Sequence, residues 1–403
     1  MLKKVTISII VLVAVIFATT RFLDKNSSNV TVVTFQTLQL LPFSKYFDDV
    51  SARFEAQNPG VKIKIIDVPY SEGEKRTLAS LLSGNPPDLI NLNPDFSMTA
   101  AKKNALWELP PLVTENFPDI LRSDVSYNGK IFALPFYLTS AVTFANVDLM
   151  RKFAISKVPA TYSELFEISK KISDKNVYAF MPLLSENDYL LKVARKEGID
   201  VFDENACLSV KNLFENYKIL FDAENIPKES LTSAHREALE KYMAGQTLFF
   251  SGGVNFLKLV AENAPETEKN TRIFPQITGK TGSFDYSVMT LIIPSKAKNK
   301  DAALKFALFL TDEENQLEFA KLTGVLPANK KALENPYFSK QSTKEEYARF
   351  ISADQIKHAR SSVKKSSDDK KISELLNYAA GSFVSGKSSN SASEFCTKVN
   401  NLK

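Results

Sequence analysis

The chain has 403 residues, more than the roughly 250 to 300 at which one hydrophobic core stops growing, so two domains are favoured. Its hydrophobic content of 44% is that of a globular protein, and a net charge of +5 is low for a nucleic-acid-binding protein. The two histidines and two distant cysteines provide no metal-ligand spacing. We therefore expect no metal, no cofactor and no nucleic-acid partner.

The N-terminus has the pattern of an export signal. Lys3 and Lys4 precede the uncharged run Val5–Thr20, and Arg21 follows it. The run ends in a poor cleavage site, and it is short for a membrane-spanning helix, which needs about 17 to 25 residues. Residues 1–25 are thus a cleaved signal peptide or a retained membrane anchor, and the protein is expected in the periplasm or on the cell surface.

Strands and helices alternate from Val30 onward. The predicted elements are a strand at Val30–Phe35, a helix at Ser44–Gln57, a strand at Val61–Ile65, a helix at Ser71–Leu82 and a strand at Asp88–Leu92. This order predicts an α/β fold with a parallel, doubly wound sheet.

The middle of the chain begins with a tight hairpin turn at residues 127–130. Thr161 and Glu164 form a capping box for a helix that ends near Ile172. The further predicted elements are a short strand at Asn176–Pro182 and amphipathic helices at Val210–Glu224 and Ser233–Met243.

One strand and two helices follow between Val288 and Leu333. The strand Val288–Ile293 stops at Pro294, and Asn299 can cap the first helix. Thr311 and Glu314 make a capping box for the second helix, which Gly324 ends.

Several stretches have amino-acid sequences typical of one protein family. They are RFEAQNPGVKIKI, LLSGNPPDLINLN, KKNALWELPPL, YNGKIFALPFYLTSAVTFANVDLM, YMAGQTLFFSGG and IIPSKAKNKDAALKFALFLTDEENQLEFAKLTGVLPANKKAL. In this order the chain resembles the extracellular solute-binding proteins of ATP-driven (ABC) importers, in the sugar-binding group that includes maltose-binding protein. The resemblance covers roughly Val30–Leu333.

The resemblance implies a two-lobed, periplasmic-binding-protein-like clamp. Residues 26–140 plus 286–330 would form the N-terminal lobe, and residues 141–285 plus 331–403 the C-terminal lobe. Three hinge crossings are expected, near residues 138–146, 280–288 and 325–335. The function implied is capture of a small solute, a sugar or oligosaccharide, by a monomer that delivers it to an ABC importer permease.

Two other functions stay open. An anchored subunit could present its solute to a signalling receptor, and the solute could be phosphorylated or otherwise polar, without being a sugar. The sequence carries none of the common nucleophile, zinc-protease or phosphate-loop motifs, so we expect no enzyme activity and no catalytic residue.

Candidate ligand-binding residues follow from the rule that ligands bind beyond the carboxyl ends of strands in open α/β sheets. A sugar needs flat apolar faces and groups that bond several hydroxyls. The candidates are Phe35, Gln36, Asn93, Asp95, Phe136, Tyr137, Ser251, Gly252, Asn255 and Tyr286, with Asp285 beside the last.

Cys207 and Cys396 are the two cysteines. They could form one disulfide in an oxidising compartment or stay as two thiols, and the sequence leaves both open.

Overall fold

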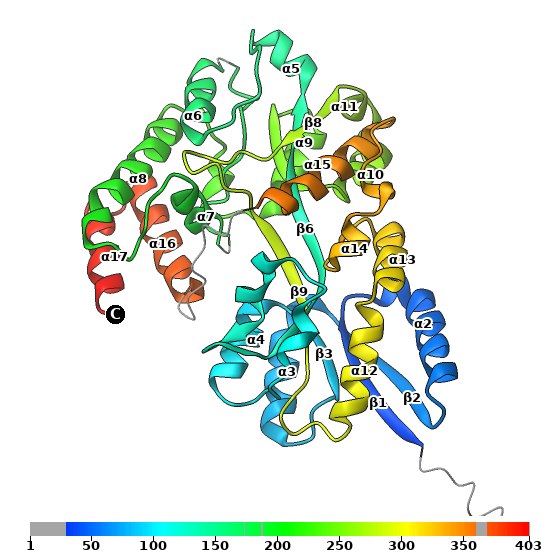
Figure 1. Ribbon diagram of the computed structural model, residues 1–403. Helices are drawn as coiled ribbons and strands as arrows, with labels where there is room; N and C mark the ends of the chain where they lie inside the picture. The colour runs from blue at the N-terminus through cyan, green and yellow to red at the C-terminus, as the bar shows by residue number, and fades with distance from the viewer. Residues whose placement is uncertain (1–29, 173, 187, 360–368, 403) are drawn as a thin grey trace, which may run out of the picture. The chain divides into compact units, whose positions relative to one another are not determined.

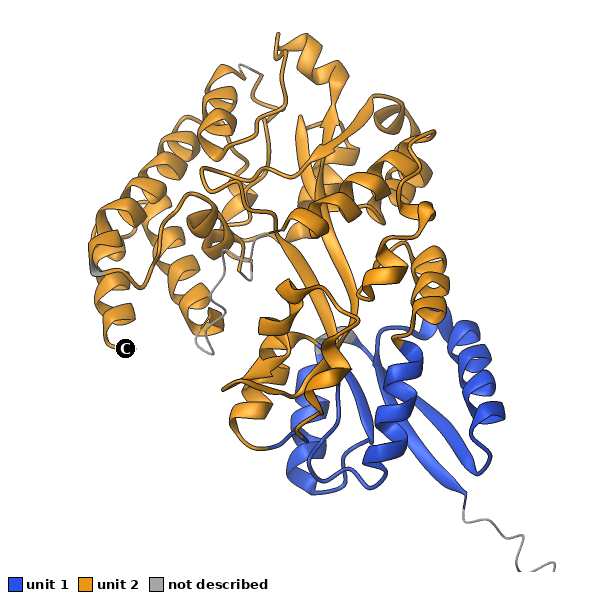
Figure 2. Ribbon diagram, viewed as in Figure 1, with its two compact units in different colours: residues 1–92, 105–107, 291–310 blue, residues 93–104, 108–290, 311–403 orange. Residues whose placement is uncertain are grey.

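The computed structural model describes residues 30–172, 174–186, 188–359 and 369–402. They form two compact units, residues up to 92 with 105–107 and 291–310, and residues 93–104 with 108–290 and 311 onward (Figure 2). The predicted signal or anchor segment, residues 1–25, lies outside the described residues, and the predicted lobe boundaries stay a prediction. In the part of the chain that is described, no helix is long and apolar enough to cross a membrane.

Unit 1 is built on a parallel three-stranded sheet with β1 in the centre (Figure 1). Its elements are β1 (Thr31–Leu38), α2 (Ser44–Gln57), β2 (Val61–Val68), α3 (Tyr70–Ser83), β3 (Leu89–Leu92) and α12 (Lys300–Leu310). Helices α2 and α12 contact each other, and both contact the sheet. Because parallel strands need a crossover helix between them, this order gives the predicted strand-helix alternation.

Aromatic side chains fill the core of unit 1. The Phe35 ring lies edge-on to Phe47 at 6.0 Å and to Phe306 at 5.8 Å between ring centroids. Phe47 and Phe54 lie one above the other on α2, and both are buried. Burying a phenylalanine stabilises the fold by about 1.5 to 3 kcal/mol, so this cluster holds α2 and α12 on β1.

Unit 2 is organised around β6 (Ala133–Asn146). Its first half pairs with β10 (Leu326–Pro327), and its second half pairs antiparallel with both β7 (Phe249–Gly253) and β8 (Thr271–Pro275). The hairpin strands β4 (Ser126–Tyr127) and β5 (Lys130–Ile131) precede it. The chain passes from unit 2 into unit 1 within β9 (Tyr286–Ile292).

Helices cover this framework in two groups. One group is α6 (Tyr162–Lys171), α7 (Tyr189–Lys196), α8 (Cys207–Asp222), α16 (Asp369–Val384) and α17 (Ser391–Asn400). The second is α9 (His235–Met243), α10 (Phe256–Asn263), α11 (Pro265–Lys269) and α15 (Lys344–His358). Other helices of unit 2 include α4 (Pro94–Lys102), α5 (Val147–Lys152), α13 (Glu313–Thr323), α14 (Lys330–Leu333) and the short 3-10 helix η3 (Asp119–Asp124). Each group covers its own apolar core.

Most local signals are confirmed. Thr161 and Glu164 form the predicted capping box of α6, and Asn128 and Gly129 take the positive φ angles of the predicted hairpin turn. Gly324 ends α13 in the left-handed conformation.

Two local predictions are wrong. Asp312, not Thr311, caps α13: the Asp312 carboxylate accepts from the Asn315 backbone N–H at 2.8 Å. The stretch 176–182 forms no strand but a single bridge between Tyr178 and Thr247.

Cys207 and Cys396 form a disulfide, with Cα atoms 5.9 Å apart. It joins the first residue of α8 to α17 across 189 residues of sequence. The cross-link therefore ties the C-terminal helix to the core on which α8 packs.

Replacing both cysteines (Cys207→Ser with Cys396→Ser) is expected to lower the free energy of unfolding by about 2 to 4 kcal/mol, because the open chain gains conformational freedom. Urea unfolding followed by circular dichroism measures this loss. Wild-type protein in reductant should match the double variant. A wild-type urea midpoint that reductant does not move would contradict the bond.

Candidate functional site

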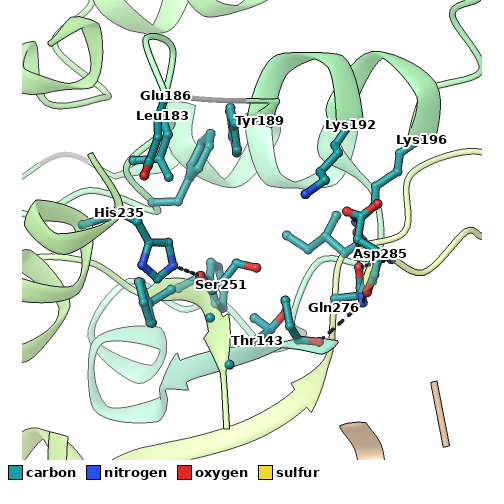
Figure 3. Close-up of a pocket in the computed structure, with 18 of the residues that line it drawn as sticks. Thr143, Leu183, Glu186, Tyr189, Lys192, Lys196, His235, Ser251, Gln276 and Asp285 are labelled. Atoms are coloured by element: carbon teal, nitrogen blue, oxygen red, sulfur yellow. Dashed lines mark hydrogen bonds and ion pairs between the residues drawn. The ribbon is translucent and has the colours of Figure 1, made fainter. Parts of the chain in front are cut away.

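A cavity of about 350 Å³ lies within unit 2. Its walls come from β6, β7, the first residues of α6 and α9, the face of α7 and the segment that leads into β9. Figure 3 shows the side chains of Lys192, Lys196, Asp285 and His235 around this space. The lining thus combines charged groups with an aromatic and aliphatic wall.

Lys196 of α7 is the most buried charge in the lining, with 4% of its side chain exposed. Its Nζ lies 2.6 Å from Oδ2 of Asp285 and donates to Oε1 of Gln276 and to the Ile277 carbonyl, each at 2.8 Å. Burial lowers the pKa of Lys196, and the Asp285 carboxylate opposes that shift. The ammonium therefore holds the Asp285 carboxylate at the cavity wall.

Gln276 connects this ion pair to the strand β6. Its Oε1 also accepts from the Asp285 backbone N–H at 2.7 Å, and its Nε2 donates to the Asp285 carbonyl at 2.9 Å. Gln355 of α15 also binds β6: its Nε2 donates to Ser140 Oγ at 2.9 Å and to the Ala141 carbonyl at 2.8 Å. These buried amides fix β6, α15 and the start of β9 in one arrangement.

Lys192 lies one turn before Lys196 and pairs with Asp188 at 3.0 Å. Burial acts to lower the pKa of Lys192, but the charges of Asp188 and Asp285 outweigh it and raise the pKa. The lysine is therefore charged at neutral pH, with a carboxylate beside it.

Aromatic rings form much of the wall. The Tyr286 hydroxyl donates to Oδ2 of Asp124 at 2.8 Å, and burial together with that carboxylate raises the pKa of Tyr286. Tyr189 of α7 is also kept neutral, because burial raises its pKa. The His235 ring lies 4.9 Å from the Phe250 ring, with Nε2 2.9 Å from the Ser251 carbonyl. Aromatic rings held in place in this way offer flat faces for a ligand.

Gly252 lets the end of β7 approach these rings. A Cβ atom on Gly252 would lie 2.5 Å from Cε1 of Phe250, whose ring packs on Phe144 and Tyr242. A side chain at this position would have to displace a ring of the core, so only glycine fits the strand as it stands.

The structure brings some of the predicted site residues together. Ser251, Gly252 and Tyr286 line the cavity, with Asp285 beside Tyr286. Ser251 and Gly252 lie in the last part of β7, and Tyr286 is the first residue of β9.

The other predicted residues lie elsewhere. Phe35 and Phe136 are fully buried core residues, and the Phe136 ring stacks on Phe319 at 5.5 Å. The Gln36 amide is buried in unit 1 and donates to Thr77 Oγ1. The remaining candidates are Asn93, which caps α4, exposed Asp95 in its first turn, Tyr137, whose ring lies 5.8 Å from Phe319, and exposed Asn255 before α10.

Sequence reasoning missed Glu186, Lys192, Lys196, His235 and Gln276. For α7 a signal existed: Asp188, Lys192 and Lys196 recur every four residues and so share one helix face. Gln276 had none, because its partners Lys196 and Gln355 are 80 and 79 residues away in sequence. The described residues hold no group of three or more His, Cys, Asp or Glu side chains that could bind a metal ion.

Comparison with known proteins identifies the family. Residues 40–317, more than half of the chain, match the model described as "Bacterial extracellular solute-binding protein". The chain belongs to this family. The predicted resemblance is thereby confirmed, and the family is one of binding proteins, not of enzymes.

Two relatives and one structure illustrate the match. The diacetylchitobiose binding protein DasA of Streptomyces coelicolor is 25% identical, over 71% of this chain and 70% of its own. An uncharacterized ABC transporter extracellular-binding protein of Pyrococcus horikoshii is 25% identical, over 72% of this chain and 70% of its own. A Synechococcus structure, described as a candidate oligosaccharide periplasmic-binding protein, superposes with a TM-score of 0.82 at 26% identity, covering 92% of this chain and 98% of that one. The fold is thus the predicted two-lobed α/β fold of periplasmic binding proteins.

Lys196→Met should lower the free energy of unfolding of this solute-binding protein by about 3 kcal/mol, because the Asp285 carboxylate loses its buried cation. Urea unfolding at pH 7 measures the loss. Lys170→Met is the matched control: Lys170 pairs with Glu167 on the surface, so its loss should be below about 0.5 kcal/mol. Equal losses in the two variants would show that the buried Lys196 pair stabilises the fold no more than a surface ion pair does.

Proposed function

We propose that this solute-binding protein captures an uncharged sugar or oligosaccharide outside the cytoplasm and delivers it to the permease of an ABC importer. The observation that carries the choice of solute is the cavity of unit 2, in which each lysine has a carboxylate partner: Lys196 has Asp285, and Lys192 has Asp188. Paired charges can orient hydroxyl groups without attracting a net charge.

A phosphorylated solute fits this lining less well. A bound phosphate needs a positive charge that is free to compensate it, usually Arg or Lys. Both cavity lysines already neutralise a carboxylate, and a third carboxylate, Glu186, also lines the space. The aromatic wall with Tyr189 and Tyr286 offers the flat faces that sugar rings use.

The names of the relatives support the same class. DasA is named for diacetylchitobiose, a structural relative is described as a candidate oligosaccharide-binding protein, and the Pyrococcus relative is assigned to an ABC transporter. Capture requires that solute prefer a closed form of the protein, since only differential affinity can shift a conformational equilibrium. Mass spectrometry of the exported protein identifies its first residue. A first residue after this segment means that residues 1–25 are cleaved, and Met1 means that they are retained as an anchor.

A thermal-shift screen tests the proposed solute class. Uncharged saccharides such as maltotriose and N,N′-diacetylchitobiose should include a ligand that raises the melting temperature, since a ligand at 100 times its Kd stabilises the native state by about 2.7 kcal/mol. Glucose 6-phosphate, the charged control, should give no shift. A response to sugar phosphates alone would reject the uncharged-sugar proposal.

A further inference from the structure

Glu186, just before α7, lines the cavity with a carboxylate oxygen that lacks a partner. Its Oε2 is buried, and among the described residues no hydrogen-bond donor reaches it. A buried acceptor left unpaired costs about 1 to 3 kcal/mol, more for a charged group. Buried polar atoms are nearly always paired, so an oxygen in a cavity wall that no described residue pairs is a candidate acceptor for a donor that enters the cavity.

The His235 backbone N–H acts on the Glu186 carboxyl group, and the charged side chains nearby have partners of their own. Asp188 is engaged by Lys192, and the Glu237 carboxylate accepts from the Ala234 backbone N–H at 3.0 Å. The Nε2 atom of His235 lies against the Ser251 carbonyl. Figure 3 shows Glu186 and His235 on the same side of the cavity, with Lys192 on the other.

The ionisation of Glu186 follows from this setting. Burial raises the pKa of its carboxyl group, His235 opposes the rise through its charge and backbone N–H, and the negative charges of Glu237 and Asp188 add to it. The ionised carboxylate is thus less stable in the folded protein than in water.

We propose, resting on the solute-binding function above, that Glu186 is a specificity-determining residue that accepts a hydrogen bond from a hydroxyl or amide N–H group of the bound solute. Uncharged, donor-bearing solutes satisfy the oxygen. Solutes that present a phosphate or carboxylate to it are repelled.

Two consequences separate this role from a structural one. Because the folded pKa of Glu186 lies above its ordinary value of 4.5, the charged carboxylate costs stability as the pH rises through the folded pKa, and that cost is absent below 4.5. Solute affinity should change in the opposite direction, since protonation removes the charged acceptor: it weakens as the pH falls through the same range.

The decisive comparison is Glu186→Gln against Glu237→Gln in the full-length protein. Glu237 is a neighbouring carboxylate whose hydrogen bond a glutamine oxygen can also accept, and it does not line the cavity. Melting temperatures without added solute at pH 8 and pH 4.5 form one arm. Calorimetric affinities for maltotriose and N,N′-diacetylchitobiose at pH 8 and pH 5 form the other.

Glu186→Gln is expected to melt higher than wild type at pH 8, with the gain shrinking at pH 4.5. For a saccharide that wild type binds, it should bind about tenfold or more weakly at pH 8, since a hydrogen bond to a charged group contributes about 1.5 to 3 kcal/mol. It should also lose the wild-type weakening between pH 8 and pH 5. Glu237→Gln should resemble wild type in affinity at pH 8 and should keep the weakening at lower pH, moved to a lower pH because the Glu237 charge no longer raises the pKa of Glu186.

Opposite results overturn the inference. A Glu186→Gln variant that melts no higher at pH 8 shows that the oxygen is already satisfied by the fold. A variant with unchanged affinity for a saccharide that wild type binds shows that the solute does not use the oxygen. If wild type binds neither saccharide while the pH 8 gain is present, the unpaired acceptor is supported and the sugar proposal is the part that fails.

Discussion

The buried amide of Gln276 is the contact on which the cavity depends. Its oxygen accepts from both Lys196 Nζ and the Asp285 backbone N–H, while its nitrogen donates to the Asp285 carbonyl. A buried amide is stable only when its donors and acceptors are satisfied together. Helix α7 and the start of β9 must therefore be in place at once, and the Gln276 backbone N–H adds α15 through Gln355.

The strand β6 carries these constraints along the chain. One part of it pairs with β10, and the rest pairs with β7 and β8. Between these parts, Ser140 and Ala141 accept from Gln355. Both residues lie in the first predicted hinge crossing, residues 138–146. The part of β6 that would bend is therefore hydrogen-bonded to α15 in the interior of the protein. Motion there must preserve or exchange those bonds, because leaving them unmade is costly.

The cavity also shows where binding and stability oppose each other. Lys196 and Asp285 satisfy one another inside the fold, whereas the Oε2 atom of Glu186 is satisfied by no described residue. The first arrangement orients a polar wall in which each buried charge has its partner. The second destabilises the unliganded protein, which is a common property of groups kept for function.

The strand-end rule selected some residues that line the cavity and others that do not, for a physical reason. It identifies where a chain turns at the edge of a sheet, as at Ser251, Gly252 and Tyr286, but not which way each side chain points. Phe35 shares the inward side of β1 with Val33, and Phe136 lies in a stretch of β6 that is buried on both faces. Their rings pack into the core, and Asn93 is used as a helix cap.

The sequence by itself determined the α/β order and most helix ends and turns, because these depend on residues a few positions apart. It also determined the family, because the typical motifs follow one another in order along the chain. It left the state of the cysteines open. The tertiary structure alone decided that Cys207 meets Cys396, that Lys196 faces Asp285, and that Gln355 reaches Ser140 from 215 residues away. Contacts of this kind depend on how separate elements pack, and a charged or amide side chain reads the same in sequence whether it ends in solvent or in a cavity wall.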